Sequence, residues 1–184
     1  MSRRRVRGVM LCEDRRQSNL VRGYLLKAGL LKPGERINVK LSRRGDASKF
    51  VRAEYPKEIA FLRSRSYQPN RLLITMIDAD RHAVEQRNKQ LDRELKQKEL
   101  APRSSQDRVF VLVPKRNVDT WIWFLNDNDV NEADDYKSSV KREHCRHAPE
   151  ELCELRKSGW DFRAGTPPSL IAGCAELRNI ENPP

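Results

Sequence analysis

The chain has 184 residues, enough for one domain with a substantial core; 34% of them are charged and 38% are hydrophobic. No stretch approaches the roughly 18 apolar residues of a transmembrane helix, and the apolar segment behind the N-terminal arginines is too short for a signal peptide. The net charge of +11 favours polyanionic partners, because basic side chains neutralise phosphates. We therefore expect no membrane segment, and we expect nucleic acid as a partner.

The four cysteines lack the spacing of a small secreted disulfide scaffold. This usage predicts reduced thiols and a cytoplasmic protein; the residues are Cys12, Cys145, Cys153 and Cys174.

Apolar runs alternate with segments of helical period in the first part of the chain. Strands are predicted at 6–12, 36–41, 72–77 and 109–113, and helices at 17–31, 49–65 and 84–100. The strand at 36–41 carries charge on one face and should lie near an edge, whereas the uninterrupted apolar runs at 72–77 and 109–113 predict central strands. Pro56 is expected either to kink its helix or to begin a new one.

Helical patterns dominate the rest of the chain. Asn117 can cap a short helix, residues 138–157 form a mixed helical region, and Thr166 with Pro167 begins a last helix. This last helix is expected to bury Leu170, Ile171, Cys174 and Leu177. The pattern predicts an α/β domain over residues 1–125, with a mainly parallel four-stranded sheet flanked by helices, and a helical C-terminal extension over 126–184 packed on it.

Carboxylates follow two of the predicted strands. Asp78 and Asp80 come after the run at 72–77, and Glu13 follows the run at 6–12. The carboxyl ends of parallel strands share one edge of a sheet, so these three side chains are expected to face one cleft. Crowded carboxylates are costly without a cation, and hard oxygen ligands suit Mg²⁺ or Mn²⁺. The alternative is that Asp80 only caps the next helix and Asp78 only ends the strand.

Basic residues lie beside these acids in the sequence, and the turn after 109–113 adds more. Lys115 and Arg116 can stabilise developing phosphate charge, or they form an ordinary solvated turn. Asp119 is either a further metal ligand or a complement to the dipole of its helix. The arginines expected to contact nucleic acid are Arg15, Arg16, Arg81 and Arg116.

The order and strand context of these residues resemble the TOPRIM domain of bacterial primases, topoisomerases, recombination mediators, ribosomal RNA maturases and OLD-family nucleases. That domain carries a glutamate after its first strand and D-x-D after its third, matched here by Glu13 and by Asp78-Ala79-Asp80. The resemblance spans about residues 6–125.

The chain is most similar to small stand-alone TOPRIM-like proteins of bacterial defence loci, in which a proline-basic turn and an acidic residue just before a tryptophan follow the fourth strand. Pro114, Lys115, Arg116, Asp119 and Trp121 supply this pattern. Two departures are that aspartate stands at 119, where glutamate is commoner, and that Asp14 stands where glycine often follows the glutamate.

The resemblance implies a Mg²⁺- or Mn²⁺-dependent nuclease acting on DNA or RNA. The implied catalytic residues are Glu13, Asp78, Asp80 and Lys115, and the implied metal ligands are Glu13, Asp78, Asp80 and Asp119. It also implies a role in phage defence with a partner ATPase, because the chain has no G-x-x-x-x-G-K-[ST] motif of its own. A homodimer is a further expectation for this chain. The alternative function is a non-catalytic TOPRIM-like module that binds nucleic acid or regulates a partner.

Overall fold

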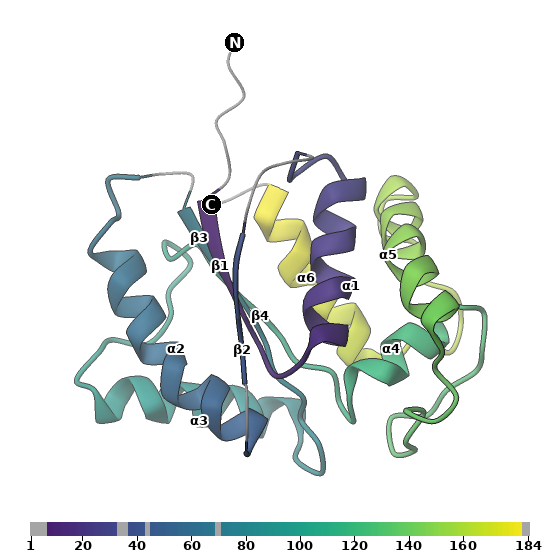
Figure 1. Cartoon of the computed structure of the whole chain (residues 1–184), viewed down its shortest axis with the longest axis horizontal. Coiled ribbons are helices and arrows are strands. Elements are labelled where there is room, and N and C mark those ends of the chain that lie inside the picture. The colour runs from purple at the N-terminus through teal and green to yellow at the C-terminus, as the bar shows by residue number, and fades with distance from the viewer. Residues whose placement is uncertain (1–6, 33–36, 43–44, 69–70, 182–184) are drawn as a thin grey trace.

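A parallel β-sheet forms the centre of the molecule (Figure 1). The computed structural model describes residues 7–32, 37–42, 45–68 and 71–181. The sheet has 4 strands in the order β2-β1-β3-β4, with β1 at Arg7–Cys12, β2 at Asn38–Leu41, β3 at Arg71–Met76 and β4 at Val109–Leu112. All neighbouring strands pair in parallel, which confirms the predicted α/β class.

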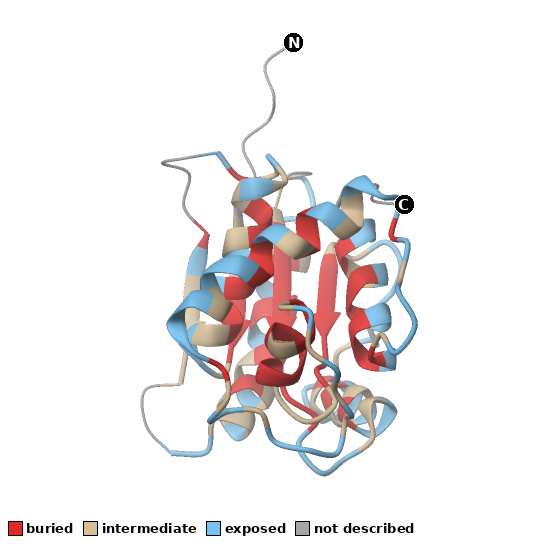
Figure 2. Ribbon diagram, turned by 90° about the vertical axis from the view of Figure 1, so that its right-hand side faces the viewer, coloured by how far each residue is buried: buried red, intermediate tan, exposed pale blue. Residues whose placement is uncertain are grey.

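Helices cover both faces of the sheet. On one face lie α2 (Ala47–Arg63) and α3 (Val84–Gln97); on the other lie α1 (Arg15–Lys27), α4 (Val118–Phe124) and α6 (Pro168–Glu181), with α5 (Arg142–Lys157) packed outside α1 (Figure 1). Each face has its own hydrophobic cluster because side chains alternate along a strand. Figure 2 shows the buried residues concentrated on the strands and on the inner faces of the helices.

Local sequence explains where several helices begin and how closely they pack. Asp14, Asp46 and Asn117 are the N-caps of α1, α2 and α4, and each side chain accepts a backbone N–H three residues further on. Gly23 allows α1 and α5 to approach, because a Cβ at this position would lie 2.7 Å from Pro149 Cγ. The C-terminal helices thus extend the core cluster of α1.

The structure corrects several sequence predictions. Of the two alternatives for Pro56, the start of a second helix is wrong, since α2 runs through this residue as one helix. The helix predicted from residue 138 begins at Arg142, and Ile171 is 40% exposed rather than buried. The predicted starts of the first two strands at residues 6 and 36 lie outside the described residues.

A further prediction, that 109–113 forms a central strand, is wrong because β4 lies at an edge of the sheet; the prediction of an edge position for β2 is confirmed. The apolar run of β4 arises because helices cover both of its faces. Its outer edge is also covered, by α6. Glu176 Oε2 accepts the Val111 N–H at 3.2 Å, and Arg103 donates to the Val109 carbonyl at 3.0 Å while forming two 2.9 Å hydrogen bonds with the Glu176 carboxylate.

None of the described helices is both long and apolar enough to cross a lipid bilayer. The four cysteines are free thiols.

Candidate functional site

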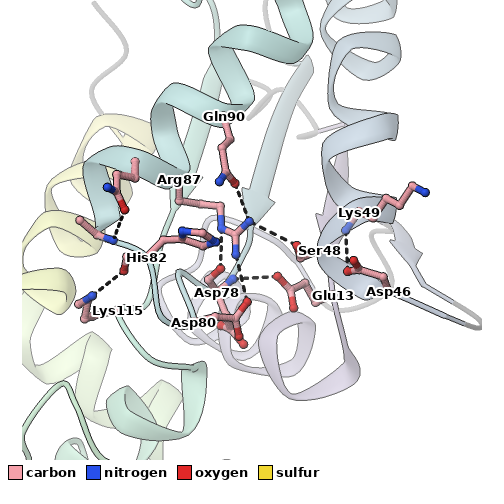
Figure 3. A network of polar contacts seen from close by, with 12 residues as sticks. Glu13, Asp46, Ser48, Lys49, Asp78, Asp80, His82, Arg87, Gln90 and Lys115 are labelled. Atoms are coloured by element: carbon pink, nitrogen blue, oxygen red, sulfur yellow. Dashed lines mark hydrogen bonds and ion pairs between the residues drawn. The ribbon is translucent and has the colours of Figure 1, made fainter.

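Two of the predicted acids meet at the carboxyl edge of the sheet. Cys12 and Met76 are paired in the ladder of β1 and β3, so Glu13 leaves the sheet beside the segment that carries Asp78. Glu13 Oε1 accepts the backbone N–H of Asp78 at 3.0 Å, although 65 positions separate the two residues in the sequence (Figure 3). The parallel strand order therefore brings these acids together.

Gln17, in the first turn of α1, links the same two residues. Its side-chain amide donates to Asp78 Oδ1 at 2.8 Å, and its carbonyl oxygen accepts the Glu13 N–H at 2.9 Å. Asp14 caps the helix by accepting the Gln17 N–H at 2.9 Å, so the aspartate in place of glycine has a structural role. Sequence reasoning missed Gln17; its place four residues after Glu13, at the start of a helix, was the available signal.

The environment of the Glu13 and Asp78 carboxylates disfavours their ionised forms. Burial is the main cause that raises the pKa of Glu13 to about 7; the Asp78 N–H opposes this rise, while Asp80 adds to it. Burial also raises the pKa of Asp78 well above its ordinary value, and the nearby Glu13 adds to the effect. Two acids that are costly to ionise at one sheet edge are typical of a site that functions with a cation or a proton.

Asp80 lies beside this pair but is bound to Arg87 on α3 (Figure 3). Arg87 is almost fully buried; its Nε donates to the Asp78 carbonyl at 2.8 Å and its Nη2 to Asp80 Oδ2 at 3.0 Å. Its Nη1 donates to Ser48 Oγ at 3.3 Å and to Gln90 Oε1 at 2.7 Å. Asp80 adopts a left-handed backbone conformation with φ of 55°, and it is not the N-cap of α3, which is Ala83.

Sequence reasoning also missed Arg87, although its position in the helix was an available signal. It falls on the same helical stripe as Val84, Leu91 and Leu95, the thin apolar face of α3. A charged residue on a buried stripe requires a polar partner inside the fold, and here the partners are the acidic segment after β3 and two side chains beside it.

Asp119 and Arg16 form a second ion pair, between the first turns of α4 and α1. Asp119 is buried, which raises its pKa, while the Arg16 guanidinium opposes the rise. Arg16 also donates to the Lys137 and Val140 carbonyls at 3.5 Å. Both residues thus have partners within the protein, and any role for Asp119 as a metal ligand or for Arg16 in binding nucleic acid requires breaking this pair.

The remaining basic candidates differ in their exposure to solvent and in their contacts within the protein. Arg15 and Arg81 are exposed, whereas Arg116 is half-buried and lies 3.8 Å from Asp135. Lys115 Nζ donates to the His82 carbonyl, which joins the turn after β4 to the turn before α3 (Figure 3). The Lys115 N–H and the Trp121 indole both donate to the buried Ser169 hydroxyl, so the first helical turn of α6 supports the Lys115 turn.

The acidic residues provide the right ligand chemistry for a hard divalent ion, because Glu13, Asp78 and Asp80 offer only carboxylate oxygens. Within the part of the chain that the structure describes, however, no three Asp, Glu, His or Cys side chains are already grouped as a metal site. The ion pair with Arg87 occupies Asp80. The donor set therefore fits Mg²⁺ or Mn²⁺ through the Glu13 and Asp78 pair, and a third ligand requires a rearranged side chain.

Comparison with protein-family models, with curated proteins and with solved structures gave no significant match. The TOPRIM resemblance thus depends on the quoted residues alone and stays a prediction.

Proposed function

We propose that this protein is a divalent-metal-dependent nuclease of TOPRIM type that hydrolyses phosphodiester bonds of DNA or RNA. The observation that carries the proposal is that the Glu13 carboxylate accepts the backbone N–H of Asp78 at the carboxyl edge of a parallel sheet, while Gln17 donates to the Asp78 carboxylate. Among the described residues, no basic side chain is bonded to either carboxylate group. A pair that is costly to ionise in the metal-free protein gains most from a bound cation.

Glu13, Asp78 and Asp80 would hold the metal in this proposal, with Asp119 as a further candidate once it leaves Arg16. The bound ion supplies polarisation of a phosphoryl oxygen and a lowered pKa of a coordinated water. Gln17 fixes the orientation of the Asp78 carboxylate, and exposed Arg15 and Arg81 offer positive charge to a phosphate backbone. Lys115 would place a further positive charge near the scissile phosphate.

A non-catalytic nucleic-acid-binding or regulatory module is the second candidate. The ion pairs of Asp80 with Arg87 and of Asp119 with Arg16 favour it, because they neutralise two of the four proposed ligands without a metal. A role in phage defence and a partner ATPase are further proposals, and both rest on the TOPRIM resemblance. A homodimer is also proposed.

The deciding experiment incubates purified protein with circular DNA, linear DNA and RNA, in Mg²⁺, in Mn²⁺ and in chelator. Cleavage that needs metal and disappears in Asp78→Asn would support the nuclease. The matched control is Asp161→Asn, which makes the same chemical change at an exposed residue beyond the end of α5. Salt-sensitive binding without cleavage of any substrate would favour the binding module.

A further inference from the structure

The Arg87 guanidinium lies in the position that decides whether Asp80 can join the other two acids. It contacts the segment after β3 twice, at the Asp78 carbonyl and at the Asp80 carboxylate. Its other contacts, to Ser48 and Gln90, come from the first turn of α2 and from α3 itself. Arg87 is therefore fixed by several groups, and among the described residues Asp80 provides the only carboxylate that it contacts.

The two side chains of the Arg87–Asp80 ion pair differ sharply in solvent exposure. The Arg87 side chain is 3% exposed, whereas that of Asp80 is 53% exposed. A rearrangement that breaks the pair costs less when the exposed aspartate moves, because the buried guanidinium keeps three other acceptors. A cation that recruits Asp80 must therefore compete with Arg87 for the same carboxylate.

We propose that Arg87 is a positioning residue that keeps the Asp80 carboxylate in an ion pair, beside the Glu13 and Asp78 pair, until a divalent cation enters, so that the three-carboxylate site assembles only on metal binding. This inference rests on the proposed function, since it concerns the same acidic site. It also accounts for the lack of a ready three-ligand group among the described residues. Arg87 then weakens metal binding, because it competes for the Asp80 carboxylate. In the metal-free protein it neutralises the charge of Asp80.

The test is Mn²⁺ binding, measured by the electron paramagnetic resonance of free Mn²⁺ at pH 8 without nucleic acid. Arg87→Gln removes the competitor and should tighten Mn²⁺ binding roughly fivefold, the effect of one partly exposed ion pair. In an Asp80→Asn background the same substitution should change the affinity little, because no carboxylate remains to be released. Arg93→Gln is the control for charge, since it removes one exposed positive charge from the same helix, α3, and should leave Mn²⁺ binding within about twofold of the parent.

Equal or weaker Mn²⁺ binding in Arg87→Gln than in a parent that binds Mn²⁺ would overturn the inference while leaving the proposed function standing. Tightening that persists in Asp80→Asn would overturn it too, because long-range charge would then be the cause. A parent that binds no Mn²⁺ at all would remove the proposed function and the inference together.

Arg87→Gln can lose its fold, because it leaves the buried Asp78 carbonyl and three partly buried acceptors without their donor. The parent protein then provides the second measurement, the NMR resonance of the Arg87 Nε–H, assigned with Arg87→Lys. Adding Mg²⁺ should shift this resonance in the parent and should shift it much less in Asp80→Asn. A resonance that does not respond to Mg²⁺ while Glu13 and Asp78 resonances do would contradict the release of Asp80.

Discussion

Carboxylates at the amino ends and at the carboxyl ends of the strands have opposite electrostatic environments. Near the amino-terminal end of β4, Asp107 accepts hydrogen bonds from Arg63 at 3.0 and 2.7 Å, and Arg63 lowers its pKa. At the carboxyl edge, Glu13 and Asp78 have raised pKa values because burial outweighs the hydrogen bonds that their carboxylates accept. Acids that stabilise a fold are paired, whereas unpaired buried acids cost stability, so the second kind indicates where to look for function.

The largest expected effect is on cleavage. If the carboxyl edge is the active site, Asp78→Asn should lower the rate of Mg²⁺-dependent hydrolysis by at least about a hundredfold, because metal polarisation is worth several kcal/mol. Asp107→Asn should leave the rate unchanged at a temperature where both variants are folded. Similar losses in both variants, measured on one substrate, would break the distinction between the two edges.

The next effect is a pH dependence of stability. The raised pKa of Glu13 means that the folded, metal-free protein keeps a proton that the unfolded chain releases, so stability falls as pH rises from about 4.5 to about 7. Glu13→Gln should remove a loss on the order of 3 kcal/mol over this range while still accepting the Asp78 N–H. Chemical unfolding at pH 5 and pH 8 measures the difference, and a parallel pH slope in parent and variant would contradict it.

The Asp107–Arg63 ion pair, at the amino ends of the strands, should give a smaller pH dependence of stability with the opposite sign. Asp107→Asn removes the negative charge and one of the two hydrogen bonds from Arg63, and it should cost about 1–2 kcal/mol at pH 7. Because the folded pKa of Asp107 is lowered, this stabilisation is present above pH ~4 and disappears as pH falls through the folded pKa. Thermal unfolding at pH 7 and below pH 3 tests it, with Asp161→Asn as the control; a cost that persists in acid would assign the effect to lost packing.

The smallest effect concerns nucleic-acid binding. Binding should weaken severalfold or more between low and physiological salt, because phosphate contacts release counterions. Arg81→Ala at the carboxyl edge should lower the affinity a few-fold and reduce the salt slope by about one. Arg65→Ala, an exposed arginine just beyond the end of α2, should change neither quantity. Equal effects of the two substitutions in a fluorescence anisotropy titration would mean that the protein binds through diffuse charge.

Sequence patterns were informative wherever an interaction follows from strand order. Apolar runs separated by helices predicted the parallel sheet, and the ends of β1 and β3 predicted that Glu13 and Asp78 would meet. The same patterns said nothing of the partners of Asp80 and Asp119, because Arg87 and Arg16 reach them only through the packing of α3 on α2 and of α1 on α4.

The position of β4 was missed for a related reason. An apolar run reports that both faces of a strand are covered, but it does not report whether a second strand lies alongside. Glu176, 65 positions further along the chain, supplies the acceptor that a neighbouring strand would otherwise provide for the Val111 N–H.

That contact has a consequence for how the protein associates with other chains. An extended peptide or a second copy that added a strand at β4 would have to displace the Glu176 carboxylate and its two bonds to Arg103. Glu176 of α6 and Arg103 of the loop before β4 thus block the β4 edge of the sheet against strand addition and against the edge-to-edge aggregation that exposed strands promote. Glu176→Ala should expose this edge, and an increase in self-association on concentration would reveal it.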